Sequence, residues 1–304
     1  MIALITGING FAGQHLEKLL TQKKIKVFGI EKDYKGNKGY LRCDITDIDE
    51  MKKIIIEINP DIIFHLAAIS SVKVCEENPA LARKINVSGF ENILKIIQGE
   101  TLKTKVLFTS SSHVYKTKGK GLISEDDELN PVSVYGKTKI EAEKLIKKYN
   151  VKAIVVRSFN HIGPGQAKGF ITSDFAGQIA KIENTKEKKG TITVGNIETV
   201  RDYTDVRDIV NAYYILMMKK ENGIYNVCMG AGFSGKELLE KMLKLSPAKI
   251  KIIKTENMPK NDIESLIGNN SKIKKATGWE PKIPIDESLK DILNYWRKKE
   301  KGII

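Results

Sequence analysis

Tyr135 and Lys139 are the two residues of this sequence whose types and spacing point most directly to chemistry. They form a Tyr-x-x-x-Lys pattern, and residues four apart lie on the same face of a helix. A lysine ammonium beside a phenol stabilises the phenolate, so we expect the pKa of Tyr135 to lie below its ordinary value of about 10. Such a phenol can exchange a proton with an alcohol or ketone oxygen near neutral pH. A surface pair in a lysine-rich chain is the alternative interpretation.

Three consecutive serines at 110–112 lie at the carboxyl end of the predicted strand that precedes this helix. In a doubly wound sheet, ligands bind beyond the carboxyl ends of the strands. A serine hydroxyl in that place can hydrogen-bond the reacting oxygen and orient it. A cap or turn role is the alternative for at least one of the three serines.

A glycine-rich turn near the start of the sequence indicates a phosphate-binding site. Gly7, Gly10 and Gly13 form G-x-x-G-x-x-G directly after a predicted strand and directly before a predicted helix. Glycine lets the backbone turn tightly and approach a pyrophosphate. The N–H groups at the start of the helix, with Phe11 and Ala12, then present the positive end of the helix dipole to the phosphates. A glycine turn without a ligand is the alternative.

An acidic residue after the second predicted strand bears on the choice of dinucleotide. Glu31 can accept hydrogen bonds from the adenosine ribose hydroxyls and repel a 2′-phosphate, which favours NAD over NADP. Lys32 follows at once and could pair with a phosphate, so NADP stays possible. A surface glutamate with no role in binding is the alternative.

Short β-branched runs alternate with amphipathic stretches in the first half of the chain. We predict strands at 2–6, 26–30, 61–66, 105–110 and 153–157, and helices at 11–21, 47–57, 80–98 and 134–148. This alternation predicts an α/β fold with a doubly wound parallel Rossmann sheet, covered by helices on both faces. The fold would carry the candidate residues on the carboxyl ends of its strands.

The pattern loosens after about residue 160, where we expect a smaller C-terminal substrate-binding lobe. Predicted elements there are helices at 170–182, 205–219 and 285–299 and strands at 191–194 and 223–227. We therefore expect residues 1–160 to form the NAD(P)-binding domain, with 191–230 partly returning to it. Residues 161–304 would form mainly the substrate-binding lobe.

Composition excludes several classes of protein. The 304 residues carry a formal charge of +14, but only six of the 51 basic residues are arginine, so we expect no nucleic-acid partner and only steering of an anionic substrate. No apolar run is long enough to cross a membrane, and no secretory signal is evident. The three scattered cysteines favour a reducing cytoplasm. The histidines lack metal-ligand spacing, so we expect no metal and assign no histidine a catalytic role.

Several motifs together resemble the extended short-chain dehydrogenase/reductase family, whose members act on nucleotide-activated sugars. They are the glycine turn with Thr6, Cys43-Asp44-Ile45, His65-Leu66-Ala67-Ala68, the serine run, the Tyr-x-x-x-Lys pattern and Arg201-Asp202-Tyr203-Thr204-Asp205-Val206. The resemblance covers nearly the whole chain and ends in Thr277-Gly278-Trp279-Glu280-Pro281. Dimerisation is usual in this family, so the resemblance implies a homodimer.

The resemblance also implies roles for individual residues. Ser111, Tyr135 and Lys139 correspond to a Ser/Thr-Tyr-Lys triad, of which the last two also contact the cofactor. Further implied cofactor contacts are Asp44 and Ile45 at the adenine, Leu66, Ala67 and Ala68 along the cofactor, and Ser158 beside the nicotinamide. Implied contacts of the nucleotide sugar are Ser112, Asn160 and Arg201, with Lys260 at a place where the related reductases carry an arginine.

Residues 158–166, with the sequence Ser-Phe-Asn-His-Ile-Gly-Pro-Gly-Gln, look most like the GDP-4-keto-6-deoxy-D-mannose reductases. The resemblance implies NAD(P)-dependent reduction of a C4 ketone. A nucleotide-sugar 4-epimerase with tightly bound NAD uses the same triad and is the first alternative. A 4,6-dehydratase ranks lower, because the acidic residue two places before the tyrosine that matches Tyr115 is replaced here by His113. A non-catalytic dinucleotide sensor also ranks lower.

Overall fold

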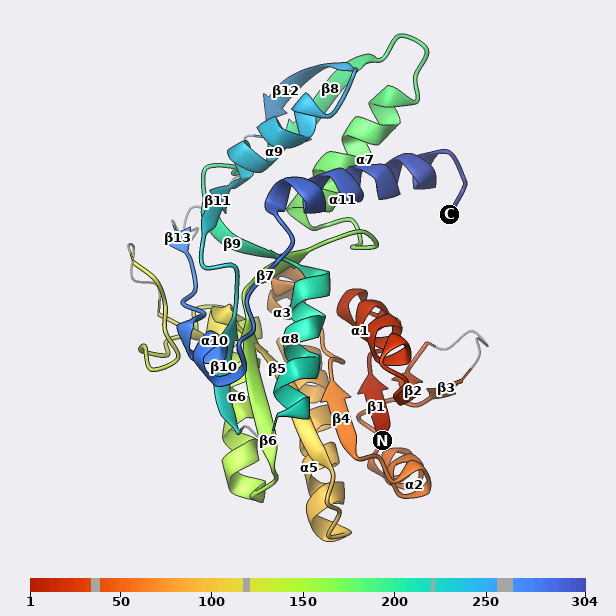
Figure 1. Cartoon of the computed structure of the whole chain (residues 1–304), viewed down its shortest axis with the longest axis vertical. Helices are drawn as coiled ribbons and strands as arrows, with labels where there is room; N and C mark the ends of the chain where they lie inside the picture. Colours follow the sequence, from red (N-terminus) through yellow and green to blue (C-terminus); the bar gives the residue numbers. More distant parts are fainter. Residues whose placement is uncertain (34–38, 117–120, 220–221, 256–264) are drawn as a thin grey trace.

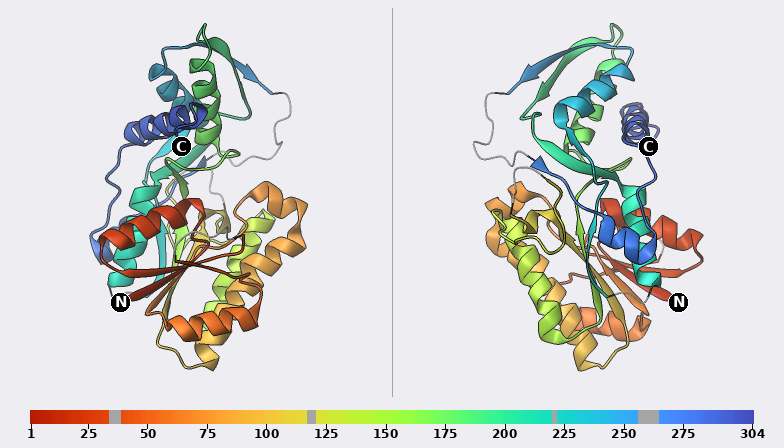
Figure 2. Two further views of the ribbon diagram at one scale, coloured as in Figure 1. Left: turned by 90° about the vertical axis from the view of Figure 1, so that its right-hand side faces the viewer. Right: turned by 60° about the vertical axis from the view of Figure 1, so that its left-hand side comes forward.

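The computed structural model describes residues 1–33, 39–116, 121–219, 222–255 and 265–304. Figure 1 shows a large parallel sheet with its helices in the lower part of the molecule, and a smaller group of helices and short strands above it. The C-terminus lies in the upper part, and the N-terminus lies at the lower end of the large sheet. The two further views in Figure 2 show the same division.

The large sheet has seven parallel strands in the order β10-β6-β5-β4-β1-β2-β3. The strands are β1 (Ile2–Thr6), β2 (Lys26–Glu31), β3 (Tyr40–Arg42), β4 (Ile62–His65), β5 (Lys105–Ser111), β6 (Ala153–Ser158) and β10 (Gly223–Val227). Strand order reverses between β1 and β4, which is the point where such sheets bind their ligands. The predicted doubly wound fold is confirmed.

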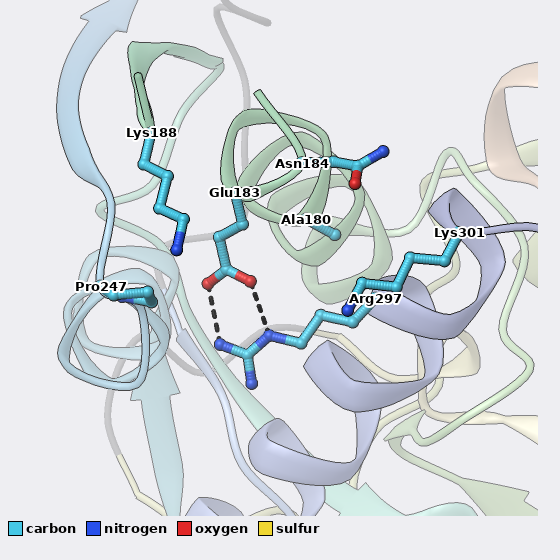
Figure 3. A pocket seen from close by; sticks show the side chains of 7 residues that line it. All are labelled: Ala180, Glu183, Asn184, Lys188, Pro247, Arg297 and Lys301. Carbon is cyan, nitrogen blue, oxygen red and sulfur yellow. Dashed lines mark hydrogen bonds and ion pairs between the residues drawn. The ribbon is translucent and has the colours of Figure 1, made fainter. Parts of the chain in front are cut away.

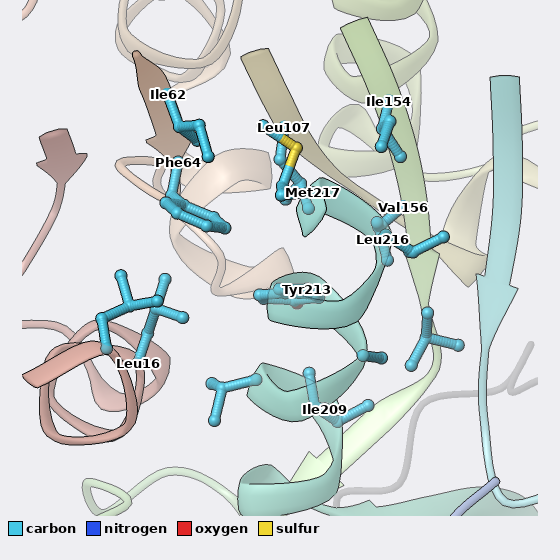
Figure 4. Close-up of a cluster of buried hydrophobic side chains, with 14 of the residues drawn as sticks. Leu16, Ile62, Phe64, Leu107, Ile154, Val156, Ile209, Tyr213, Leu216 and Met217 are labelled. Atoms are coloured by element: carbon cyan, nitrogen blue, oxygen red, sulfur yellow. The ribbon is translucent and has the colours of Figure 1, made fainter. Parts of the chain in front are cut away.

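Helices cover both faces of this sheet because its strands are apolar on both sides. On one face, α1 (Phe11–Gln22) and α8 (Val206–Met218) share a buried cluster with alternate residues of the strands. Figure 4 shows Tyr213 and Leu216 of α8 within that cluster, together with Leu107 and Val156 of the sheet. On the other face, α2 (Ile48–Ile58), α5 (Gly89–Gly99) and α6 (Val134–Tyr149) bury a second cluster.

The helix predicted at 80–98 is interrupted. The structure has α3 (Val72–Glu77), α4 (Pro79–Arg83), a π-helical segment at Lys84–Ser88, and then α5. Buried Asn86 lies inside the π-helical segment and binds three groups: the N–H and C=O of Ile69 and the hydroxyl of Thr138 on α6. A π-bulge turns a side chain out of the regular helical pattern, and here it lets Asn86 tie α6 to the loop after β4.

The upper part contains two small sheets. In one, β9 (Val200–Asp205) pairs with β7 (Asn160–Ile162), β11 (Gly232–Ser234) and β13 (Ser265–Leu266). In the other, β8 (Lys189–Val194) pairs with β12 (Lys249–Lys254). Helices α7 (Ile171–Glu183), α9 (Gly235–Lys244) and α11 (Ile285–Glu300) share a third core with these strands, and α10 (Ser271–Thr277) packs on β10. Within 191–230, α8 and β10 pack with the large sheet, whereas β9 does not.

Candidate active site

The glycine turn connects β1 to α1 and fits a dinucleotide diphosphate. Gly7 has a φ of +72°, and a Cβ there would lie 2.9 Å from the backbone of Ala67. A Cβ on Gly13 would lie 2.5 Å from the carbonyl oxygens of Gly7 and Ile8. The loop after β4, the turn and the helix therefore approach each other so closely that no side chain can be accommodated at either position. Glycine at both positions permits this close backbone approach.

Helix α1 begins without a side-chain cap in the described part of the chain, since its N-cap is Gly10. The N–H groups of the first helical turn, on Phe11 and Ala12, are the natural partners of an anion at that end. The ring of Phe11 points elsewhere: it stacks on His161 with 5.8 Å between the ring centres. The two residues thus offer backbone, not side chains, to a phosphate.

The acidic residues predicted to hold the adenosine half lie at the ends of β2 and β3. Glu31 accepts a hydrogen bond from the Asn9 N–H in the glycine turn, at 3.2 Å. Lys32 forms an ion pair with Asp44, with 2.9 Å between Nζ and Oδ2. Asp44 is also held by the backbone and hydroxyl of Thr46. Glu31 and Asp44 therefore lie at the same edge of the glycine turn, and Lys32 is paired with Asp44.

The loop after β4 is tied to the end of β1. Leu66 donates its N–H to the Thr6 carbonyl at 3.2 Å, and Ala67 donates to the Thr6 hydroxyl at 3.3 Å. Half-buried Ala68 continues this loop. Ile45 lies below it against α5, where a Cβ on Gly89 would come within 2.6 Å of the Ile45 side chain. The loop after β4 thus lies at the carboxyl ends of β1 and β4, where strand order reverses.

The catalytic candidates meet at the carboxyl end of β5. Ser133 caps helix α6, and its hydroxyl accepts the Gly136 N–H at 3.1 Å. This cap places Tyr135 in the first turn, where its phenol lies near the side chain of Ser111. The ring of His113 lies edge-on to the Tyr135 ring, with 5.7 Å between ring centres.

Lys139 is buried one turn further along α6. Its ammonium donates a hydrogen bond to the Thr109 carbonyl at 2.8 Å. Burial disfavours the charged form and lowers the pKa of Lys139 to about 8, against smaller opposing effects of Cys75 and Glu143. Its Nζ lies 5.7 Å from the centre of the Tyr135 ring, so the two side chains are neighbours.

The expected pKa of Tyr135 is wrong in direction. Burial raises the pKa of Tyr135 to about 12, while the hydrogen bond from Ser111 acts in the opposite sense. The expectation assumed that the Lys139 ammonium lies against the phenol oxygen. In the structure the ammonium binds a backbone carbonyl of β5 instead, and loss of water around the phenol has the larger effect.

The remaining predicted residues lie around this point or beyond it. Ser158 is the register partner of Ser111 on β6, and its hydroxyl hydrogen-bonds Tyr213 at 2.8 Å. The Ser112 hydroxyl is buried and has no hydrogen-bond partner among the described residues. Asn160 on β7 pairs in register with Tyr203 of β9, two residues after Arg201. Lys260 lies outside the described residues.

Sequence reasoning missed several residues that hold the site together. Asn86 and Thr109 bind α6 from the π-helical segment and from β5. Glu143 and Arg157 form a buried ion pair one helical turn behind Lys139. Glu143 could have been found, because it lies four residues after Lys139 on the same helical face. Arg157 carries no comparable signal, since it stands within an otherwise apolar strand.

Two surface cavities lie in the upper part of the molecule. The one in Figure 3, of about 250 Å³, is lined by Ala180, Glu183, Asn184, Lys188, Pro247, Arg297 and Lys301. Arg297 of α11 pairs there with Glu183 of α7. The lining contains no predicted site residue. Within the described ranges, no group of three or more His, Cys, Asp or Glu side chains could hold a metal ion, and no helix is long and apolar enough to cross a bilayer.

The chain is similar to known nucleotide-sugar enzymes along nearly its whole length. GDP-6-deoxy-D-mannose reductase of Pseudomonas aeruginosa is 29% identical over 97% of this chain and 97% of the relative. GDP-6-deoxy-D-talose 4-dehydrogenase of Aggregatibacter actinomycetemcomitans is 31% identical over 91% of this chain and 92% of the relative.

Solved structures show the same similarity. The structure of RMD from Pseudomonas aeruginosa complexed with NADPH superposes with a TM-score of 0.87 at 29% identity, covering 98% of this chain and 99% of that one. UDP-glucose 4-epimerase of Thermotoga maritima with UDP-glucose gives a TM-score of 0.88 at 27% identity, again covering 98% and 99%. The resemblance to the extended short-chain dehydrogenase/reductases is thereby confirmed. Since the family model described as GDP-mannose 4,6 dehydratase matches residues 4–292, the chain belongs to that family.

Proposed function

We propose that this enzyme reduces the C4 ketone of a nucleotide-activated 4-keto-6-deoxy sugar, with GDP as the nucleotide, as a GDP-4-keto-6-deoxy-D-mannose reductase does. The observation that carries the proposal is the meeting of Ser111, Tyr135 and Lys139 at the carboxyl end of β5, next to the crevice where strand order reverses. The similarity to GDP-6-deoxy-D-mannose reductase supports the choice of sugar and base.

The proton needed for reduction comes from Tyr135. With a pKa of about 12, Tyr135 is a phenol at neutral pH and holds the proton that a reduced ketone must receive. The Ser111 hydroxyl lies near the phenol, so it can orient the C4 oxygen at the same place. Lys139 lies next to Tyr135, with its Nζ 5.7 Å from the centre of the phenol ring. A reduced nicotinamide, when bound, would supply the hydride.

The glycine turn, Glu31, Asp44, Ile45, residues 66–68 and Ser158 would hold the cofactor. We propose a preference for NAD over NADP, because the Glu31 carboxylate occupies the end of β2 and Lys32 is already paired with Asp44. The structure of RMD from Pseudomonas aeruginosa, which has the same fold, contains NADPH, so NADP stays an alternative cofactor. Initial rates with NADH and NADPH test the preference.

We propose that Ser112, Asn160, Arg201 and Lys260 contact the nucleotide sugar. Support for Ser112 is its buried hydroxyl, which lacks a partner in the described part of the chain and gains a hydrogen bond from a ligand. Arg201 suits a diphosphate because a guanidinium binds phosphate oxygens in a bidentate manner. Residues 1–160, with part of 191–230, would bind the cofactor, and 161–304 mainly the sugar nucleotide.

The test is a panel of 4-keto and 4-hydroxy sugar nucleotides offered with NADH or NADPH, with cofactor absorbance and product followed together. Stoichiometric oxidation of the reduced cofactor by a 4-keto sugar supports reduction. Interconversion of two 4-hydroxy sugars without net cofactor change would instead identify a 4-epimerase, a class also present among the relatives. An epimerase should further retain NAD through purification, since it regenerates its cofactor within one cycle.

We also propose a homodimer that works in the cytoplasm. The three cysteines are free and buried, as expected in a reducing compartment. The dimer rests on the family resemblance. Light scattering after size-exclusion chromatography tests the assembly, and a mass equal to one chain would contradict it.

A further inference from the structure

Three side chains of α6 contact three consecutive residues of β5. Tyr135 lies near Ser111, Lys139 donates a hydrogen bond to the Thr109 carbonyl, and the Ser110 hydroxyl donates one to Glu143. Tyr135, Lys139 and Glu143 are spaced by four residues and so lie along one helical face. The contacts therefore fix how far α6 is shifted along β5. The first two involve the proposed catalytic groups, and the third lies one turn behind them.

Glu143 also joins α6 to the next strand. Arg157 of β6 donates to both carboxylate oxygens of Glu143, from Nη2 at 2.8 Å and from Nε at 3.1 Å. The side chains are only 2% and 9% exposed for Arg157 and Glu143, respectively. Arg157 is the register partner of Ser110, so Glu143 binds two paired residues of adjacent strands.

The Nη1 group of Arg157 makes two further hydrogen bonds. It donates to the Tyr115 hydroxyl at 3.0 Å and to the Glu125 carbonyl at 3.1 Å. Tyr115 in turn donates to Asn226 of β10 at 2.6 Å. Glu143 thus binds a guanidinium that makes four hydrogen bonds and is linked through Tyr115 to β10.

A buried ion pair is a poor way to gain stability, because apolar residues of similar volume often stabilise a protein as much or more. Its better-attested use is to specify one arrangement of neighbouring elements. We propose that Glu143, held by Arg157 and Ser110, is a positioning residue that sets α6 in the register placing Tyr135 at Ser111 and Lys139 at Thr109. The inference rests on the function proposed for Tyr135 and Lys139.

The charge of Glu143 allows the positioning role to be tested by a second measurement, the pKa of Lys139. The groups that face Lys139 are His65 from β4, Cys75 from α3 and, on α6 itself, Tyr135 and Glu143. The Glu143 carboxylate raises the pKa of Lys139 against the effect of burial. Removing that charge should therefore let Lys139 lose its proton at lower pH.

The chain offers a matched control. Glu183 and Arg297 form a second bidentate pair, at 2.7 and 2.8 Å, in the cavity of Figure 3 and far along the chain from the catalytic candidates. Glu183→Gln and Glu143→Gln make the same chemical change in the same kind of pair. Both variants should lose thermal stability. Only Glu143→Gln should lower kcat, by about tenfold or more with KM nearly unchanged, as expected for a misplaced catalytic group.

The pH profile separates positioning from a purely structural role. Glu143→Gln should move the alkaline limb of turnover, and the alkaline loss of NADH binding, to lower pH, whereas Glu183→Gln should leave both midpoints in place. Ser110→Ala removes the hydrogen bond of Glu143 to β5 but keeps both charges of the ion pair, so it should lower kcat without moving either midpoint. This variant also tests the inference if Glu143→Gln does not fold. One combined result would overturn the proposed positioning role of Glu143. The two glutamine variants would lose equal stability and keep the wild-type kcat and midpoints, and Ser110→Ala would also keep the wild-type kcat.

Failure of the proposed function would look different. If the wild type reduced no sugar nucleotide, or if Tyr135→Phe kept full turnover, the catalytic assignment would be wrong. The pH dependence of NADH binding would then still report on Lys139. A midpoint shifted in Glu143→Gln but not in Glu183→Gln would support the coupling of Glu143 to Lys139 without any turnover.

Discussion

Lys139 reaches past Tyr135 to the backbone of β5: its ammonium lies 2.8 Å from the Thr109 carbonyl oxygen. The Tyr135 phenol lies near Ser111, and burial raises its pKa to about 12. This arrangement keeps the phenol protonated at neutral pH. It suits a reaction in which Tyr135 gives up a proton to a newly reduced oxygen.

Lys139 should control the alkaline side of cofactor binding. Because its pKa is lowered to about 8, the ammonium expected to contact the cofactor loses its charge as the pH rises through that value. We expect NADH affinity, measured by fluorescence titration, to weaken above about pH 8 in the wild type. Lys139→Met should bind NADH more weakly and without this pH dependence. An equally steep alkaline loss in Lys139→Met would contradict the assignment.

Gly13 should tolerate no side chain. A Cβ there would lie 2.5 Å from two carbonyl oxygens of the turn, so Gly13→Ala should cost about 1–3 kcal/mol of unfolding free energy and weaken NADH binding. Gly99 at the end of α5 is the control, because a Cβ there meets nothing within 4 Å. Gly99→Ala should change stability by less than about 1 kcal/mol. Urea unfolding of both variants checks this, and equal losses would show that the turn can adapt.

His65 should make stability depend on pH. Its imidazole is 1% exposed and stacks on Phe90 and Phe108, and burial lowers its pKa to about 3. The folded chain thus keeps His65 neutral, while the unfolded chain protonates it below about pH 6.5. The stability from this group is complete above that pH and is lost as the pH falls toward 3.

The comparison of wild type with His65→Gln isolates this effect. Between about pH 7.5 and about pH 5.5, the stability advantage of the wild type should shrink by about 1.4 kcal/mol. Urea unfolding at both pH values gives the two differences. An advantage that stays constant would mean that His65 titrates alike in the folded and unfolded chains.

Glu31 should set the choice of cofactor. Its carboxylate lies at the end of β2 beside the glycine turn, where it would repel a 2′-phosphate. Glu31→Gln should reduce the ratio of kcat/KM for NADH over NADPH by about tenfold, equivalent to about 1.4 kcal/mol. Lys32→Met breaks the ion pair with Asp44 but leaves Glu31 in place, so it should keep the preference for NADH. Loss of the preference in Lys32→Met alone would assign it to the lysine.

The parts of the fold that sequence reasoning found are those with a local signal. Apart from β3, the strands of the large sheet are apolar runs, and the glycine turn and the Tyr-x-x-x-Lys pattern are defined by spacing alone. Strands such as β3, β7 and β13 have two or three residues and depend on partners distant in sequence, so no periodic pattern reveals them. The π-helical segment around Asn86 is set by contacts with Ile69 and Thr138 and is equally hidden.

The candidate site shows the same limit. Spacing placed Tyr135 and Lys139 on one helical face, but it could not say which atom the ammonium would bind. The pKa of Tyr135 depends on burial, and burial depends on how α6 packs against β5 and α3. A local sequence pattern therefore could not predict the direction in which the pKa of Tyr135 is shifted.

The most direct test of the proposed chemistry is the rate of the Tyr135→Phe variant with a 4-keto-6-deoxy sugar nucleotide and saturating NADH. Removing the proton donor should lower kcat by about 10²- to 10⁴-fold, while NADH affinity stays close to that of the wild type. A variant that reduces the ketone at the wild-type rate, with NADH still bound, would contradict the assignment of Tyr135 as the proton donor.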